Sequence, residues 1–513
     1  DLFVPLSFAG RDLMLHFGSA GYTADVFVNG AQVGKGRLPY LPFEADITHA
    51  ARPGETMSVA VRVSNEESAD GLTPGISAED FAREGRRKDE VFPATRPDFF
   101  PYGGLHRPVY LMALPQARLE GARVDTEVDG RKALVHVSAA SEGRIGARLR
   151  LQERIVAEAA GDGALTLTVD APSLWSPQTP TLYDLDLALL RDGEPVDALS
   201  LPVGIRTIAC EGRQLLLNGE PVFLRGFGRH EDADISGRGL NLPMMVKDFG
   251  LMRWCGANSF RTSHYPYAEE QLDWADRHGV LVVSELACVN LDFRNVSETT
   301  QEHHLAALRA QIARDRNHPS VIMWSLANEP GYLGEPDYNE EKAGPYWDAV
   351  FAEARALDPA RPLTMANVQY AGVDDPAFAR CDVIGLNRYH GWYDAPGQIA
   401  CGAARLRETM DLLAQRHEKP IALWEFGADA LHGEHATYDQ LFTEEYQAEF
   451  IAAYLDVAER HPACIGAHIW NLADFRTAQH FRRVVDNRKG VFTRARKPKR
   501  AAFMLRERWT KGH

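Results

Sequence analysis

The chain has 513 residues, of which 45% are hydrophobic and 25% charged, and its formal net charge is −15. Apolar residues are spread over the whole length, which argues against disorder, and no Lys/Arg-rich stretch offsets the acidic surplus, which argues against a nucleic-acid binder. No apolar run approaches the roughly 18 residues of a membrane span, and the length predicts roughly three domains of about 150 residues.

Residues 1–115 follow a β pattern. Short alternating runs occupy 13–17, 25–29 and 58–63, and Asn29-Gly30 marks a hairpin turn after the second run. Residues 66–97 form a charged loop of a length typical of functional loops. Residues 116–206 continue with alternating runs at 133–137 and 165–169 and show no helical period, which predicts an immunoglobulin-type sandwich.

The pattern changes at about residue 207, where short apolar runs begin to alternate with amphipathic helices. Met245, Phe249 and Met252, for example, have the i, i+4, i+7 spacing of a helix face. Eight runs in roughly 300 residues predict a (β/α)8 barrel, although the connections after the fifth and sixth runs lack a clear helical pattern. The predicted strands are 222–226, 259–262, 280–285, 321–327, 363–367, 383–387, 421–425 and 465–470.

Two predicted strands lead into a glutamate. Glu329 follows the fourth strand within Asn328-Glu329-Pro330, and Glu425 ends the seventh. Chemistry in such barrels takes place where strands end, so the two carboxyl groups should face each other across the mouth. Such a pair suits glycoside hydrolysis, in which one group protonates the leaving oxygen and the other attacks the anomeric carbon or activates water. We favour this interpretation over two separate ion pairs at the rim.

Long motifs resemble family 2 glycoside hydrolases, and within them the β-glucuronidases; they lie at 98–108, 223–234, 256–267, 387–393 and 470–475. The resemblance covers essentially the whole chain and implies a multidomain β plus α/β protein. Residues 1–115 would be a sugar-binding, jelly-roll-like β-sandwich lacking its first strands, 116–206 an immunoglobulin-like β-sandwich, and 207–513 a catalytic TIM barrel.

The resemblance implies a retaining, exo-acting β-glucuronidase that works by double displacement without cofactor or metal. Glu329 would be the acid/base and Glu425 the nucleophile. A general acid must hold its proton in the free enzyme, so we expect a raised pKa for Glu329 and an ionised Glu425. The remaining implied sugar contacts are Asp98, His230, Asn328, Asn387, Tyr389, Tyr393 and Trp470, with Asn328 on the 2-hydroxyl and Tyr389 supporting the nucleophile.

The loop at 482–490 carries four cations in an otherwise acidic chain. Recognition of a uronic acid requires a local positive site for its carboxylate. The family's uronate signature, Asn-x-Lys, fits Asn487-Arg488-Lys489, and Arg483 adds a second cation. We expect the loop to lie at the mouth and outside the core.

Three alternatives stay open. A β-galacturonidase would bind its substrate with the same residues, because Asn-x-Lys recognises the sugar carboxylate and not the 4-hydroxyl. A family 2 β-galactosidase would have no need of Asn487 and Lys489, and a non-catalytic carbohydrate-binding protein would have no need of a nucleophile on the seventh strand. By analogy with the family we expect a homo-oligomer whose substrate is a small conjugate or an oligosaccharide.

Cysteine usage and the chain start bear on location. The six cysteines include no C-x-x-C pair, which gives a zinc ribbon no support. Most lie in apolar segments, so we expect buried, reduced thiols and a cytoplasmic protein. The chain begins at Asp1 and looks clipped, which leaves a periplasmic location open. We assign no metal-ligand role to His303 and His304, and we expect a long loop at 331–344.

Overall fold

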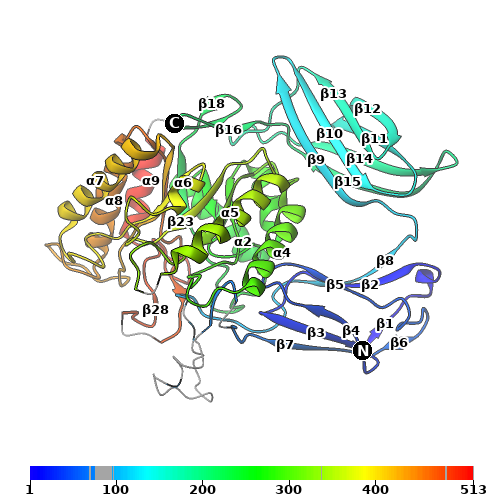
Figure 1. Cartoon of the computed structure of the whole chain (residues 1–513), viewed down its shortest axis with the longest axis horizontal. Coiled ribbons are helices and arrows are strands. Elements are labelled where there is room, and N and C mark those ends of the chain that lie inside the picture. The colour runs from blue at the N-terminus through cyan, green and yellow to red at the C-terminus, as the bar shows by residue number, and fades with distance from the viewer. Residues whose placement is uncertain are drawn as a thin grey trace.

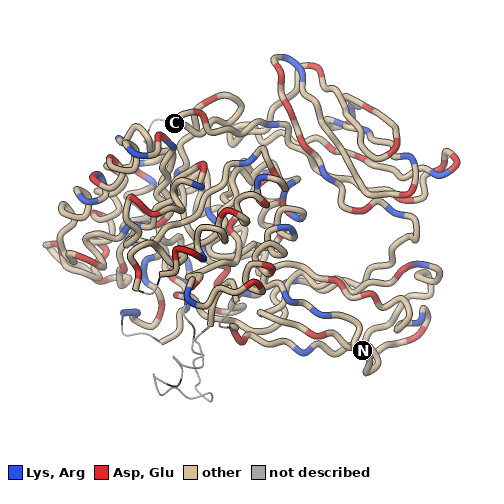
Figure 2. The backbone as a smooth tube through the Cα atoms, in the orientation of Figure 1, with Lys and Arg blue, Asp and Glu red and all other residues tan. Residues whose placement is uncertain are grey.

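The computed structural model describes residues 1–68, 71–75, 82, 95, 97–336, 338–479 and 482–511. It combines two antiparallel β regions with a closed parallel barrel, as expected for a multidomain β plus TIM-barrel protein. In Figure 1 the barrel lies on the left, with the first β region at lower right and the second at upper right. Lys, Arg, Asp and Glu are interspersed along the backbone (Figure 2). Among the described helices, none has the length and hydrophobicity needed to cross a bilayer.

The first β region contains the sheets β5-β2-β8 and β4-β3-β7 and the pair β1-β6. Inward residues of β2 and β3, such as Leu15 and Val26, share one apolar core. Asn29 and Gly30 both have positive φ at the turn between β3 and β4, which confirms the predicted hairpin. The strands are β1 (Leu2–Phe3), β2 (Asp12–Phe17), β3 (Thr23–Val28), β4 (Ala31–Gly36), β5 (Phe43–Asp46), β6 (Thr56–Met57), β7 (Val59–Ser64) and β8 (Val109–Leu114), with a short 3-10 helix at Leu6–Phe8.

The second β region is built from the sheets β13-β10-β9 and β12-β11-β14-β15. Buried residues alternate with more exposed ones along β10, β11, β13 and β14, and Val135, Leu149, Leu167 and Leu185 meet in a core between the sheets. This alternation is typical of a sandwich with one solvated face on each sheet. The strands are β9 (Glu120–Asp129), β10 (Lys132–Ala140), β11 (Arg144–Leu151), β12 (Arg154–Asp162), β13 (Ala164–Asp170), β14 (Tyr183–Arg191) and β15 (Glu194–Val203).

Eight parallel strands close the barrel in sequence order, β19 to β26. The predicted strands agree with them to within two residues at each end. The first strand begins late because the Val222 amide donates to the Leu215 carbonyl of β17, in the small sheet before the barrel. The strands are β19 (Leu224–Gly228), β20 (Ser259–Arg261), β21 (Leu281–Glu285), β22 (Val321–Asn328), β23 (Leu363–Asn367), β24 (Ile384–Asn387), β25 (Ile421–Glu425) and β26 (Cys464–Ile469), preceded by β16 (Ile208–Glu211), β17 (Gln214–Leu217) and β18 (Glu220–Pro221).

Two expectations about the barrel connections were wrong. A 19-residue helix, α7, follows β24, and its buried residues Leu406, Met410 and Leu413 have the i, i+4, i+7 spacing of a helix face. The expected loop at 331–344 ends early, because the Asn339 side chain caps a helix that begins at Glu340. The helices are α2 (Leu242–Cys255), α3 (Glu269–His278), α4 (Glu298–Asp315), α5 (Glu340–Leu357), α6 (Ala377–Arg380), α7 (Ile399–His417), α8 (Glu444–Arg460) and α9 (Arg500–Thr510), and β27 (Phe475–Arg476) pairs with β28 (Asp486–Asn487).

All six cysteines carry free thiols in the structure. Four of them are buried, Cys210 is half-buried and Cys401 is exposed. The expectation of buried, reduced thiols therefore holds for most of them.

Candidate active site

The predicted carboxyl pair lies where barrel strands end. β22 ends at Asn328 and leads into Glu329, whose φ of 46° places it in the left-handed region. β24 ends at Asn387, which is in register with Glu425 at the end of β25. The Asn387 amide donates to Glu329 Oε1 at 2.9 Å and to Asn328 Oδ1 at 3.2 Å. Parallel pairing thus brings Asn328, Glu329, Asn387 and Glu425 together at one edge.

Glu425 is buried among hydrogen-bond donors. The Tyr389 hydroxyl donates to Glu425 Oε2 at 2.7 Å, and Arg261 Nη2 donates to Glu425 Oε1. The pKa of Glu425 is nevertheless raised to about 8, chiefly by burial and also by the Glu329 charge, while Arg261 and Tyr389 oppose the rise. The sequence predicted a carboxylate that is ionised in the free protein. In this site the two donors favour the anion, but desolvation outweighs them.

Burial also raises the pKa of Glu329, with Asn387 and Arg261 acting in the opposite direction. This direction agrees with the expectation for a general acid. Glu329 therefore has the environment of a group that keeps its proton at a pH where an exposed glutamate is ionised.

The sequence interpretation missed a third glutamate at a strand end. Glu285 ends β21 and is fully buried, and its carboxylate accepts hydrogen bonds from Arg261 Nη1 and from His264 Nδ1 at 2.8 Å. The signal was present, because the predicted strand 280–285 ended in this residue. Arg261 and His264 lay inside a recognised motif without a role assigned to them.

Aromatic rings cover the other side of the mouth. Trp470 stacks on His264 at 4.8 Å between centroids and meets His230 edge-on at 5.3 Å. His230 Nδ1 lies 3.2 Å from the Tyr265 hydroxyl, and its Nε2 has no hydrogen-bond partner among the described residues. Burial holds the pKa of His230 well below its ordinary value, so the ring is neutral. His230 and Trp470 thus lie in the predicted part of the site.

The basic loop meets the first β region through Asp98. Arg483 Nε donates to both Asp98 oxygens, and Oδ2 also accepts from Arg483 Nη2 at 2.6 Å and from Asn487 Nδ2 at 2.8 Å. Arg483 Nη2 also donates to the Tyr393 hydroxyl at 2.8 Å. Asp98 is 44% exposed and Arg483 only 11%, so this pair forms the outer part of the loop site. Residues almost 400 positions apart therefore build one carboxylate-binding group.

Lys489 lies deeper, and the prediction that its loop stays outside the core was wrong for this residue. Its side chain is fully buried, and its ammonium donates to Asp429 Oδ2. The ammonium also faces the rings of Tyr389, Trp392 and Tyr393 at 5.7, 5.3 and 4.8 Å from their centroids. A buried cation needs such a partner.

Sequence reasoning missed Asp429, although it lies four residues after Glu425 in the loop that leaves β25. Burial acts to raise the pKa of Asp429, but Lys489 and Arg483 outweigh it and hold the pKa below its ordinary value.

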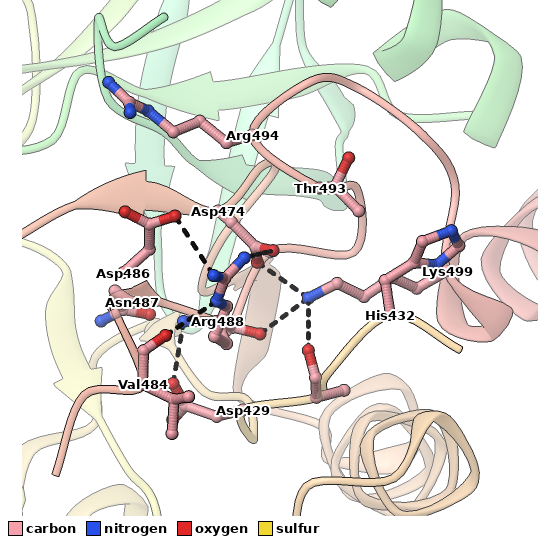
Figure 3. A network of polar contacts seen from close by, with 12 residues as sticks. Asp429, His432, Asp474, Val484, Asp486, Asn487, Arg488, Thr493, Arg494 and Lys499 are labelled. Carbon is pink, nitrogen blue, oxygen red and sulfur yellow. Dashed lines mark hydrogen bonds and ion pairs between the residues drawn. The ribbon is translucent and has the colours of Figure 1, made fainter. Parts of the chain in front are cut away.

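Arg488, the middle residue of Asn-x-Lys, pairs with other acids than Lys489 does. Figure 3 shows its guanidinium directed to Asp474 and Asp486, at 3.6 and 3.5 Å, while Lys499 Nζ donates to the Arg488 carbonyl at 2.9 Å. Lys499 also donates to Asp474 Oδ1 and the Ala430 carbonyl, both at 2.8 Å. Lys499 thus ties the backbone between Asn487 and Lys489 to the C-terminal segment.

A group of possible metal ligands among the described residues, Asp273, Asp276 and His318, lies at the opposite end of the barrel, before β22 begins. His318 Nδ1 is 2.6 Å from Asp276 Oδ2, and Asp276 raises the pKa of His318 although burial opposes this. His318 and Asp276 therefore form an ion pair, and Asp273 is an acid beside it.

Comparison with known proteins adds a family relationship. Residues 208–513 match the model of the glycosyl hydrolases family 2 TIM barrel domain, and residues 117–206 match that of glycosyl hydrolases family 2. A β-glucuronidase of Paenibacillus borealis is 42% identical over 99% of this chain and 86% of its own length. The β-glucuronidase of Felis catus is 38% identical over 98% and 79%.

Solved structures of β-glucuronidases are also similar to this chain. That of β-D-glucuronidase from Dictyoglomus thermophilum has a TM-score of 0.91 at 41% identity and covers 99% of this chain and 89% of that one. A β-glucuronidase from Ruminococcus gnavus in complex with uronic deoxynojirimycin has a TM-score of 0.92 at 35% identity, with 99% and 87% covered.

Proposed function

This chain belongs to glycosyl hydrolase family 2 and is a glycoside hydrolase, and we propose that it releases β-D-glucuronic acid from β-D-glucuronides by an exo-acting, retaining double displacement. The observation that carries the uronate assignment is the donor set of Arg483 and Asn487, which already binds a carboxylate, that of Asp98. A sugar carboxylate has the same two oxygens and suits the same planar donors. The relatives named above as β-glucuronidases support the same substrate class.

In the first step Glu425 attacks the anomeric carbon while Glu329 passes its proton to the departing aglycone oxygen. The products are a glycosyl ester on Glu425 and the free aglycone. Ester formation removes the charge of Glu425, which lowers the pKa of Glu329. Glu329 then takes a proton from water, whose oxygen attacks the anomeric carbon and frees Glu425.

The single proton of the resting pair belongs on Glu329. Glu425 accepts hydrogen bonds from a guanidinium and a hydroxyl, whereas Glu329 accepts one from the neutral amide of Asn387. Donors stabilise the ionised form, so the one-proton state places the charge on Glu425. This is the state that the first step requires.

Free polar atoms around the pair suit the sugar hydroxyls. Asn387 Oδ1 and His230 Nε2 make no hydrogen bond to described residues although both atoms are buried. Buried polar atoms are normally satisfied, so we assign both to contacts with substrate hydroxyls. Asn328 is assigned to the 2-hydroxyl, and Tyr393 and Trp470 to the walls.

A screen of para-nitrophenyl glycosides tests the substrate. The β-glucuronide should have the highest kcat/KM, with the β-glucoside and β-galactoside at least about a hundredfold lower, because loss of a charge-assisted contact costs about 1.5–3 kcal/mol and more than one is lost. The β-galacturonide tests the alternative that shares the carboxylate, and a higher kcat/KM for it would reassign the enzyme. A β-galactoside preferred over both uronides would contradict uronate recognition.

The pH profile should be bell-shaped, because turnover needs Glu425 ionised and Glu329 protonated. Burial raises the pKa of both groups. Activity should therefore fall as the pH drops and Glu425 gains a proton, and fall again as the pH rises and Glu329 loses its own. In Glu329→Ala, assayed with an aryl glucuronide that needs little protonation on leaving, the alkaline limb should vanish. An unchanged alkaline limb would show that another group controls it.

A further inference from the structure

We propose that Glu285 is a positioning residue for Glu425, which it governs through Arg261 and His264 without touching the sugar. The inference rests on the proposed function in one respect, that Glu425 is the nucleophile. Glu285 ends β21, the strand next to the one that leads into Glu329, and its side chain is fully buried. Nothing in the proposed displacement uses this carboxylate directly.

The Glu285 carboxylate is held on both oxygens. Oε1 accepts from His264 Nδ1 at 2.8 Å, and Oε2 accepts from Arg261 Nη1 and from the Ser325 hydroxyl at 2.7 Å. Its own backbone amide donates to Thr262 Oγ1 at 2.8 Å. Arg261 and these donors outweigh burial and hold the pKa of Glu285 below its ordinary value. Glu285 is therefore a fixed anion that joins β20, β21 and β22.

Arg261 is shared between two carboxylates. Its Nη1 donates to Glu285 and its Nη2 to Glu425. The two terminal nitrogens of a guanidinium lie in one rigid plane, so the bond to Glu285 fixes the direction of the bond to Glu425. Sharing also means that Glu425 receives only part of the stabilisation that the cation would give to a single partner.

Glu285 also fixes the proton on His264. Burial lowers the pKa of His264, so the ring is neutral and carries one N–H. The ionised Glu285 can only accept, so that N–H is on Nδ1. Nε2 then presents a lone pair 3.6 Å from Glu425 Oε1. A lone pair cannot donate to a carboxylate, so in this tautomer His264 gives Glu425 no hydrogen bond.

Groups from three other strand ends also surround Glu425. Tyr389, after β24, donates to it, and Glu329, after β22, adds a negative charge. Trp470, after β26, stacks on His264 and lies 5.9 Å from the Arg261 guanidinium carbon. Of these groups, Arg261 supplies the positive charge that opposes the high pKa of Glu425, and Glu285 determines how much of it reaches the nucleophile.

Glu285→Gln in the full chain tests the proposal. Arg261 would serve Glu425 alone and His264 could turn its N–H toward it, so the acidic limb of kcat/KM for an aryl glucuronide should move about one unit to lower pH. At the optimum kcat should fall roughly tenfold or more, because Arg261 and Glu425 lose their fixed geometry. KM should stay within about twofold, since Arg483 and Asn487 are untouched.

Ser325→Ala is the matched control, because it removes a neutral hydrogen bond from the same Glu285 oxygen and keeps the charge. Its acidic limb should stay at the wild-type pH. Glu285→Asp keeps the charge and shortens the reach, so it should lower kcat and leave the limb in place. If Glu285→Gln fails to fold, an unchanged kcat in Glu285→Asp overturns the proposal.

The outcomes separate this inference from the proposed function. Two results would overturn the role of Glu285 while wild-type glucuronide hydrolysis stands. One is an acidic limb that does not shift in folded Glu285→Gln, and the other is a KM that rises by as large a factor as kcat falls. Absence of glucuronide hydrolysis in the wild type overturns the proposed function instead.

Discussion

Glu425→Ala should abolish turnover of β-glucuronides, with a loss on the order of 10^5-fold or more in kcat, as for removal of a nucleophile in other enzymes. No glycosyl ester can form without this carboxylate. The fold should persist, because Arg261 keeps its bond to Glu285 when Glu425 is removed. The measurement is kcat for an aryl glucuronide, together with the thermal midpoint of the variant.

Azide distinguishes the nucleophile from the acid/base. In Glu329→Ala the ester still forms from an aryl glucuronide, and azide should attack it to give a β-glucuronyl azide. In Glu425→Ala azide replaces the nucleophile and should give the α-azide. The reverse pattern would mean that the two roles are exchanged. Proton NMR of the first product should show the β-anomer of the sugar, and the α-anomer would exclude double displacement.

The barrel was predictable because of how its strands are buried. Parallel strands covered on both faces read as continuous apolar runs, and Val321–Asn328 is buried at every position. The ends of those runs located Glu329 and Glu425 correctly. Helix α7 was missed although Leu406, Met410 and Leu413 have the same i, i+4, i+7 spacing that indicated the helix after the first barrel strand.

The supporting charges could not be placed from sequence alone. Glu285 and Asp429 stand in apolar or neutral segments. Each is paired with a cation from another part of the chain, Glu285 with Arg261 and Asp429 with Lys489. Sequence spacing does not show which buried charges meet. The same holds for Asp98, whose partner Arg483 lies 385 residues further on.

Tyr389 connects the two halves of the site. Its hydroxyl donates to Glu425 at 2.7 Å, and the Lys489 ammonium lies 5.7 Å from its ring centroid. The residues proposed to read the sugar carboxylate and those proposed to attack the anomeric carbon therefore pack against the same side chain. The effect of Lys489 on the substrate carboxylate is therefore separated from an effect on the nucleophile by comparing a substrate that has a carboxylate with one that lacks it.

Because Lys489 is buried against Asp429, a simple truncation would confound specificity with stability. Removing one partner of a buried ion pair typically costs about 3–5 kcal/mol, since the other charge stays uncompensated. Lys489→Met combined with Asp429→Asn removes both charges and keeps similar volumes. Asp429→Asn alone shows what the loss of the acid contributes.

The double variant should lose roughly ten- to a hundredfold in kcat/KM for the β-glucuronide, the effect of one charge-assisted contact of about 1.5–3 kcal/mol. Activity on the β-glucoside, which has no carboxylate, should change little. Arg488→Gln is the matched control, because it removes a cation from the same loop that faces Asp474 and Asp486 instead. It should leave the ratio of the two substrates unchanged.

The ratio of the two kcat/KM values decides the role of Lys489. A carboxylate-reading ammonium acts only on a substrate that has a carboxylate, so the glucuronide-to-glucoside ratio must fall in the double variant. The Lys489 ammonium also faces the ring of Tyr389 at 5.7 Å, so a purely supporting role would lower kcat/KM for both substrates through Glu425. Equal proportional losses would therefore assign Lys489 to support of the nucleophile and leave Arg483 and Asn487 as the carboxylate's partners.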